Sequence, residues 1–173
     1  MNRARSRLRV VRGDITGLAS DAIVNAANSR LEPGGGVCGA IHRAAGPRLA
    51  TACREVGGCP PGEARITPGF ELPARYVIHA VGPVWRGGDQ NEPEVLCRAY
   101  QSALRLARLH SLRSIAFPAI STGVYGFPLE RATDIAVHCV EEWLEDEPEF
   151  DEVIFAVIHD DAERTYRRAL ASR

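Results

Sequence analysis

The sequence predicts an α/β protein, organised as a three-layer α/β/α sandwich around a mixed central sheet. Short apolar segments of strand length alternate along the chain with longer segments of helical periodicity, which is typical of a sheet covered by helices. The segment Ser114–Ile120 is almost wholly apolar, as in a central strand that is buried on both faces. Residues Pro68–Arg75 carry the glycine and prolines of a short hairpin-like link, so we expect a mixed sheet rather than a wholly parallel one.

The first half of the chain supplies four expected strands and one long helix. Leu8–Val11 and Ala22–Val24 are short apolar runs of strand length. The glycine run Gly34–Gly36 leads into a helix expected from about Val37 to Val56, because apolar residues recur there at spacings of three and four. The next two expected strands, residues 63–67 and 76–81, lie on either side of the hairpin-like link.

The second half is expected to alternate helix and strand. Leu96, Ala99 and Tyr100 begin an apolar stripe that predicts a helix over residues 94–109. Pro128 is suited to the first turn of the next helix, since proline is tolerated there. A last strand over residues 153–158 and a last helix over residues 161–170 complete the pattern.

Composition limits the function classes that fit the chain. At 173 residues it is the size of one domain, residues 1–173, and 45% hydrophobic with 25% charged residues is typical of a folded globular protein. The net charge of −1 disfavours wholesale nucleic-acid binding. The chain contains no lysine, which excludes a Schiff-base or Walker lysine. Any phosphate must therefore be bound by backbone amides or by arginine.

The five cysteines indicate a reducing compartment. Their number is odd and no two form a C-x-x-C pair, so a secreted disulfide scaffold or a zinc site is not expected, and a cytoplasmic location fits better. The arginine-rich start of the chain lacks the apolar core of a signal peptide, and no apolar run is long enough to span a membrane. The cysteines are Cys38, Cys53, Cys59, Cys97 and Cys139.

Two loops rich in small residues carry the strongest functional signal. Asn25–Asn28 and Ile120–Gly126 each follow a strand-like run, and the glycine run Gly34–Gly36 opens a helix. Bare backbone N–H groups at such places bind oxyanions, and a helix N-terminus adds a favourable partial charge. Two such loops on one sheet predict a ligand with two phosphates, such as a diphosphate-bridged nucleotide.

Several single residues have two interpretations. Asp14 either accepts a hydrogen bond from a base or caps the next turn, and capping is favoured because Asp is a common N-cap. Asn25 and Asn28 either hold a ribose hydroxyl or serve turn chemistry. His79 lies within a strand and is interpreted as a satisfied core histidine. A nucleophilic Cys38 is disfavoured because no histidine partner is assignable.

In order and spacing, these segments resemble the macrodomain family. Within it they are most similar to the bacterial branch of O-acetyl-ADP-ribose deacetylases and mono-ADP-ribosyl hydrolases. The matching segments are Gly13–Thr16, Asp21–Asn28, Gly34–Gly46, His79–Pro83 and Phe117–Gly126. The resemblance implies a mixed sheet between helices, with ADP-ribose in a cleft at one end and no metal or other cofactor.

The resemblance also implies roles for particular residues. Asp14 would hold the adenine amine, Ile15 would pack near the base, and His159 would flank it. Asn28 would bind the distal ribose and orient the attacking water, and with Cys38 and Tyr125 it occupies the implied catalytic positions. The residues implied to enclose the diphosphate and the distal ribose are Gly35, Gly36, Val37, Ser121, Thr122, Gly123, Val124, Tyr125, Gly126 and Phe127.

Cys38 departs from the family pattern, which usually has an aspartate that helps to activate water. A neutral thiol is a poor substitute for a carboxylate base. Two functions therefore stay open. One is an enzyme that removes the ester from O-acetyl-ADP-ribose, or mono-ADP-ribose from Asp or Glu of proteins, with the substrate's own phosphate orienting the water. The other is a reader that binds ADP-ribose or ADP-ribosylated proteins without turnover.

A third and weaker possibility is nucleic-acid regulation through the arginines near the start of the chain. A charged first strand is more often a solvated edge, so nucleic acid is not an expected partner. These arginines are Arg3, Arg5, Arg7, Arg9 and Arg12.

Overall fold

A six-stranded mixed sheet organises the protein. The computed structural model describes residues 3–172. The strands run in the order β1-β6-β5-β2-β4-β3, and every neighbouring pair is parallel except β3 and β4. This confirms the predicted mixed sheet and its antiparallel link. The strands are β1 (Leu8–Arg12), β2 (Ala22–Ala26), β3 (Ala64–Pro68), β4 (Tyr76–Ala80), β5 (Ser114–Phe117) and β6 (Glu152–Val157).

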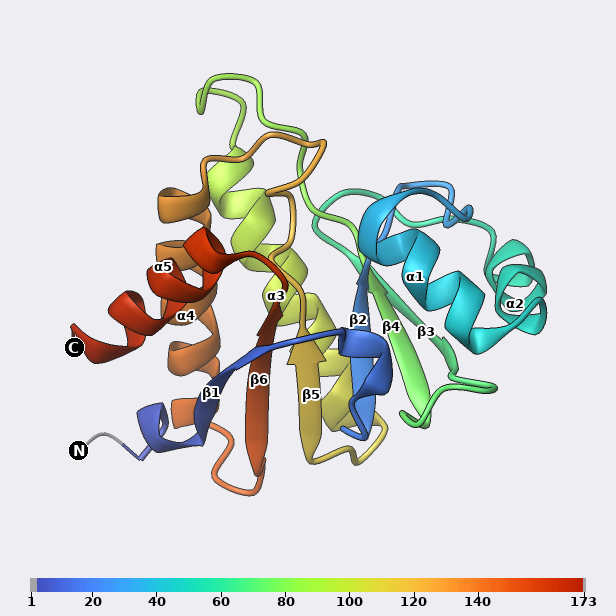
Figure 1. The fold of residues 1–173 in the computed structure, drawn as a ribbon, viewed down its shortest axis with the longest axis horizontal. Coiled ribbons are helices and arrows are strands. Elements are labelled where there is room, and N and C mark those ends of the chain that lie inside the picture. Colours follow the sequence, from blue (N-terminus) through green and yellow to red (C-terminus); the bar gives the residue numbers. More distant parts are fainter. Residues whose placement is uncertain (1–2, 173) are drawn as a thin grey trace.

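Helices cover both faces of this sheet (Figure 1). Two separate apolar cores result, one beneath α3, α4 and α5 and the other beneath α1 and α2. The predicted α/β/α sandwich is therefore confirmed. The helices are α1 (Gly36–Ala45), α2 (Arg48–Val56), α3 (Glu92–Leu109), α4 (Leu129–Glu145) and α5 (Asp160–Ala171), with short 3-10 turns η1 (Arg5–Arg7) and η2 (Ile15–Gly17).

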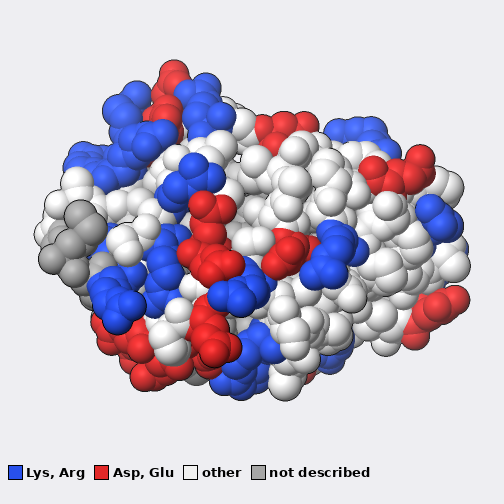
Figure 2. Space-filling view, turned by 90° about the horizontal axis from the view of Figure 1, so that it is seen from below, with Lys and Arg blue, Asp and Glu red and all other residues white. Residues whose placement is uncertain are grey.

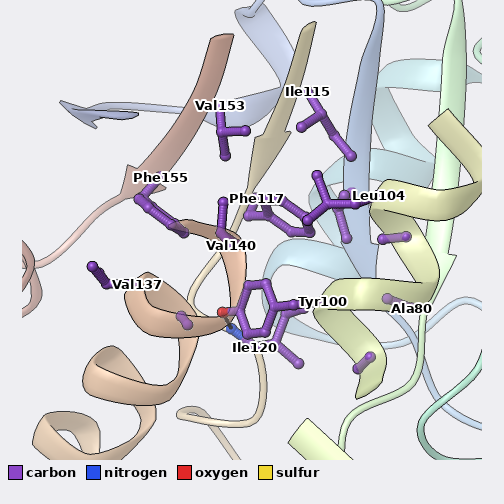
Figure 3. Packing of buried hydrophobic residues seen from close by; sticks show 14 of the residues in the cluster. Ala80, Tyr100, Leu104, Ile115, Phe117, Ile120, Val137, Val140, Val153 and Phe155 are labelled. Carbon is purple, nitrogen blue, oxygen red and sulfur yellow. Dashed lines mark hydrogen bonds between the residues drawn. The ribbon is translucent and has the colours of Figure 1, made fainter. Parts of the chain in front are cut away.

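The alternation of side chains along β5 shows how one strand serves both cores. Ile115 and Phe117 face the α3–α5 core, and Ala116 faces the α1–α2 core. In the first of these cores the Phe117 ring lies 4.9 Å from the ring of Tyr100, which α3 contributes (Figure 3). All three β5 residues are fully buried, as predicted for a central strand.

The long helix predicted over residues 37–56 is wrong: the structure contains two shorter helices. Gly46 has φ = +90°, outside the helical region, and Pro47 follows it. Glycine adopts this φ readily whereas other residues are strained there, so Gly46 favours a break in the helix. The other boundaries shift less: α3 begins at Glu92, and β5 ends at Phe117 because the following Pro118 cannot donate to a ladder.

The arginines near the start of the chain bind groups of the protein itself. Arg7 donates to the carbonyls of Leu144, Glu147 and Phe150, at distances of 2.7–2.8 Å, and so caps the C-terminal end of α4. Three other arginines pair with carboxylates; the pairs are Arg5 with Glu141, Arg9 with Glu152 and Arg12 with Asp160. Viewed from below, basic and acidic residues are interspersed without a wide field of one sign (Figure 2).

Cysteine spacing gave no indication of the one disulfide that the described residues form. It joins Cys97 of α3 to Cys139 of α4, and the remaining cysteines, Cys38, Cys53 and Cys59, are free and buried. The bonded pair comes together only because the two helices pack side by side. No helix between residues 3 and 172 is long and apolar enough to cross a bilayer.

Candidate functional site

The two predicted loops meet at one edge of the sheet. β2 and β5 are parallel neighbours, with Ala22 opposite Ile115, so the loops that follow them emerge at the same end. In Figure 1 this is the upper edge, where α1 also begins. Chain segments almost a hundred residues apart therefore form one site.

Asn28 and Cys38 lie side by side at this edge. The Nδ2 group of Asn28 donates to the carbonyl oxygen of Glu32 at 2.9 Å, and Sγ of Cys38 lies 3.7 Å from the same oxygen. The Asn28 Oδ1 atom accepts the amides of Arg30 and Glu32, both at 3.1 Å. The side chain of Asn28 thus stabilises the loop that leads to the glycine run. Cys38, which is 7% exposed, lies against the same loop.

The start of α1 presents unpaired amides. The first N–H groups of any helix lack intrahelical acceptors, and here these are the amides of Gly36, Val37 and Cys38. A β-carbon at Gly35 or Gly36 would meet no atom within 4 Å, so both glycines border open space. A helix N-terminus of this kind favours an anion.

The loop over residues 121–127 presents a second set of unpaired backbone amides. Backbone bonds fold it tightly: Phe127 donates to Ser121 and Gly126 to Gly123, each at 2.9 Å. Within the described chain, the amides of Gly123, Val124 and Tyr125 donate to no acceptor. We call these three amides, together with the three at the start of α1, the anion cradle. The loop also contains two residues with positive φ, Ser121 at +67° and Gly126 at +73°.

Two residues of the second loop differ sharply in exposure. Val124 is completely exposed at the tip, and Tyr125 is half-buried. Phe127 is only 2% exposed, and its ring packs 4.7 Å from that of Trp85. The structure therefore places Phe127 as a support beneath the loop rather than on its open surface.

Gly82 holds the start of this loop in place. Oγ of Ser121 is buried without a hydrogen-bond partner among the described residues. A β-carbon at Gly82 would lie 2.2 Å from that oxygen and 2.6 Å from Cγ2 of Ile120, so any larger residue would force these side chains to move. From the other side, the hydroxyl of Tyr100 accepts the amide of Ile120 at 3.4 Å (Figure 3).

Asp14 and His159 follow the ends of the neighbouring strands β1 and β6. The amide of Gly13 donates to Val157 at 2.9 Å, which ties the end of β1 to the end of β6. Asp14 accepts the amide and the hydroxyl of Thr16, at 2.9 and 2.8 Å, so the predicted capping role is confirmed. The hydrogen bond from the Thr16 amide, followed by that from its hydroxyl, lowers the pKa of Asp14. His159 is exposed and precedes α5.

Asn25 and His79 lie inside the protein. Asn25 is 1% exposed, and its Nδ2 lies 3.1 Å from Nδ1 of His79. His79 Nε2 is 2.9 Å from Oγ1 of Thr67, which confirms a satisfied core histidine. Burial, followed by the charge of nearby His42, lowers the pKa of His79 to about 3, so the ring is neutral at pH 7. Of the two asparagines in the motif, only Asn28 reaches the site.

Sequence reasoning missed Glu92, which organises the loop over residues 84–91. Its carboxylate accepts the amides of Arg86, Gly88 and Gln90 at 2.8, 2.9 and 2.6 Å. Burial alone would raise the pKa of Glu92, but these amide bonds outweigh it and lower the pKa to about 2. The same loop places Trp85 against the second loop, where its amide donates to Tyr125 at 2.8 Å. In the sequence, the only indication of this role was that Glu92 is an acidic residue just before the predicted start of the helix at residue 94.

No group of three or more His, Cys, Asp or Glu side chains that would suit a metal ion occurs between residues 3 and 172. The site consists instead of backbone amides, one asparagine, one thiol and aromatic rings. Such a set binds anions and sugars rather than cations.

Comparison with known proteins identifies the family. The Macro domain family matches residues 24–136, which include the first loop, α1 and the second loop. The chain belongs to the Macro domain family. A Macro domain-containing protein of Chlorobaculum tepidum is 54% identical over 165 residues, covering 95% of this chain and 96% of the relative. An O-acetyl-ADP-ribose deacetylase of Citrobacter rodentium is 51% identical over 172 residues, covering 97% of each.

Solved macrodomains share the fold over almost the whole chain. A macrodomain of Oceanobacillus iheyensis with ADP superposes with a TM-score of 0.90 at 42% identity, covering 94% of this macrodomain and 89% of that chain. A Trypanosoma brucei macrodomain in complex with ADP-ribose gives a TM-score of 0.90 at 47% identity, covering 95% of this chain and 69% of that one. The predicted family and fold are therefore both confirmed.

Proposed function

We propose that this macrodomain binds ADP-ribose and hydrolyses an ester on its distal ribose. The substrates would be O-acetyl-ADP-ribose and proteins that carry mono-ADP-ribose on Asp or Glu. The relative from Citrobacter rodentium is named for the first of these reactions, and the Trypanosoma brucei macrodomain is described with ADP-ribose bound. Over the aligned residues they are 51% and 47% identical to this chain.

The observation that carries the proposal is the anion cradle. Unpaired amides at the start of α1 and at Gly123–Tyr125 emerge at one edge of the sheet, and a pyrophosphate needs two such donor sets. Asp14, Ile15 and His159 stand at the end of β1 and β6, which suits an adenine. Asn28 and Cys38 then mark the distal ribose end.

Hydrolysis requires a water molecule to attack the ester carbonyl. The bond between the acyl carbon and the ribose oxygen breaks, which releases the carboxylic acid and ADP-ribose. Asn28 holds the loop that borders the ribose, and Tyr125, half-buried at the facing loop, covers the sugar. The cradle amides stabilise the phosphate charge and fix the substrate in one position.

A carboxylate base is missing beside Asn28, because Cys38 stands at that position. A thiol that is 7% exposed and directed at the Glu32 carbonyl is poorly suited to take a proton from water. We therefore assign proton acceptance to the substrate's own phosphate, which the cradle holds nearby. The same observation supports the second candidate function, a reader that binds ADP-ribose without turnover.

Two measurements separate these functions. Calorimetric titration with ADP-ribose, AMP and NAD tests binding, and we expect ADP-ribose to bind most tightly because it fills both the cradle and the ribose end. A single-turnover assay with O-acetyl-ADP-ribose, and with an aspartyl-ADP-ribosylated protein, tests hydrolysis. ADP-ribose binding without ester release above background would leave the reader, and an absence of binding would refute both.

Variants assign the roles within the site. Asn28→Ala is expected to reduce the single-turnover rate, whereas Gln101→Ala, an amide on α3 away from the cleft, should not change it. Cys38→Asp should raise the rate if the missing carboxylate limits catalysis. An unchanged or lower rate would support attack assisted by the substrate phosphate. Cys59→Ala serves as the control for loss of a buried thiol elsewhere.

A further inference from the structure

The Cys97–Cys139 disulfide borders an open groove on the side of the protein formed by α3 and α4. The groove has a volume of about 420 Å³, and both cysteines line it. Cys97 is half-buried and Cys139 is 5% exposed, so Cys97 is the more exposed residue of the two. The three remaining cysteines are buried and unpaired with one another.

Apolar packing also joins the two helices that this bond connects. α3 and α4 pack through a fully buried apolar interface that includes Ala99, Ala103, Ala136 and Val140. A domain of this size buries enough apolar surface to fold without a covalent link. The Cα atoms of the two cysteines lie 5.9 Å apart, a separation that the packed helices set by themselves.

The groove also has a defined charge. Glu94 and Asp134 line it together with His138, and a second hollow along α4 is lined by Glu141, Glu142 and Glu145. His138 pairs with Glu142 at 3.2 Å. The groove beside the sulfurs itself has two carboxylates, Glu94 and Asp134, and one histidine, so a thiolate with an additional negative charge is repelled more than one without it.

We propose that Cys97–Cys139 is a reversible thiol–disulfide exchange site that reacts in the folded protein with uncharged dithiols. A thiolate of the dithiol attacks Sγ of Cys97, the Cys97–Cys139 bond breaks, and Cys139 leaves as a thiolate that takes a proton from solvent. The second thiolate of the reductant then displaces Cys97 and closes a cyclic disulfide. Two electrons and two protons pass to the protein, and an oxidised dithiol reverses the reaction.

Counting thiols tests this site. After treatment with an oxidised dithiol, denaturation and alkylation, we expect three labelled cysteines per chain, Cys38, Cys53 and Cys59. After exposure of the folded protein to dithiothreitol, an acid quench and the same alkylation, we expect all five. Cys97→Ser and Cys139→Ser should each show no dithiothreitol-dependent gain, whereas Cys59→Ser should still gain two labels.

Matched thiols test the route through the groove. Both reagents attack as thiolates, but 2-mercaptoethanesulfonate carries an additional negative charge on its sulfonate. At equal thiolate concentration and low ionic strength, we expect 2-mercaptoethanol to react about fivefold faster. The difference should shrink as salt is added. Five labels after oxidation would overturn the proposal because no bond forms. Reduction that occurs only in denaturant would also overturn the proposal, because the disulfide would then be inaccessible to thiols in the folded protein. Equal rates for both thiols would refute entry through the acidic groove.

Discussion

Gly82→Ala tests whether packing behind the second loop sets the geometry of the anion cradle. The added β-carbon would lie 2.2 Å from Oγ of Ser121 and 2.6 Å from Cγ2 of Ile120. A β-carbon essentially never lies within 3.0 Å of another heavy atom, so Oγ of Ser121 must move by about 0.8 Å, and Ile120 must move with it. Overpacking of this kind costs about 1–3 kcal/mol of folding stability. For a domain of this size each kcal/mol corresponds to roughly 2–4 °C in melting temperature.

The binding consequence follows from the place of the clash. The displaced residues precede the amides of Gly123–Tyr125, so these donors would no longer point at a pyrophosphate held by α1. A 1 Å misplacement lowers catalytic efficiency by about a hundredfold in other enzymes, and we expect the Kd for ADP-ribose to rise by about tenfold or more. Calorimetry on the variant measures this, and circular dichroism records the melting temperature.

A double-mutant cycle isolates the cause. Ser121→Gly removes the hydroxyl, and glycine readily adopts the φ of +67° at this position. We expect Ser121→Gly alone to have little effect and to restore part of the affinity of Gly82→Ala. Gly17→Ala, whose β-carbon meets no atom within 4 Å, is the control. An unchanged Kd in Gly82→Ala would refute the argument, as would a loss that Ser121→Gly does not reduce.

Three further predictions concern stability. The pKa of Glu92 is about 2 in the folded protein against 4.5 unperturbed. Its contribution to folding stability is therefore complete above pH 4.5 and is lost as the pH falls toward 2. Glu92→Gln should flatten that part of the acid-unfolding curve and lower the melting temperature at pH 7. His79 is buried in its neutral form, with a pKa of about 3 against 6.5 unperturbed, so it destabilises the fold as the pH falls below 6.5. His79→Gln should weaken the pH dependence of the unfolding free energy between pH 6.5 and 3. An unaltered slope of that free energy against pH would contradict the assignment. Arg7→Ala should lower the free energy of unfolding in urea by about 1–3 kcal/mol, because three carbonyls at the end of α4 and in the segment after it lose a charged donor. Arg3→Ala, at an exposed position, should have little effect.

Local patterns in the sequence were sufficient for much of the fold. Alternating apolar runs predicted all six strands, and β5 was correctly assigned to the centre of the sheet because a strand with two covered faces has no polar positions. The Asp14 cap depends on residues two positions apart, so it too was predictable. The helix break at Gly46–Pro47 was also encoded locally, and the apolar periodicity on both sides of it hid the signal.

The order of the motifs predicted the family, and the strand pattern placed both loops at the ends of strands. Sequence patterns did not distinguish the roles of Asn25 and Asn28, because both belong to one four-residue motif. The tertiary structure was needed to separate them. Asn25 lies on β2 with its side chain directed at His79, whereas Asn28 lies beyond the strand and bonds the following loop. Which asparagine reaches the site depends on where β2 ends, and the end of β2 is set by the pairing of this strand with β4 and β5.

The sequence by itself thus determined the six strands, their order along the chain and the two loops rich in small residues, since each of these depends on residues close together in the chain. Only the tertiary structure decided that Cys97 bonds Cys139 and that Gly82 leaves room for Ser121. The cysteines are 42 residues apart, and Gly82 and Ser121 are similarly remote in the chain. Contacts of this kind arise from the packing of helices and loops on the finished sheet, and no local pattern records which residues that packing brings together.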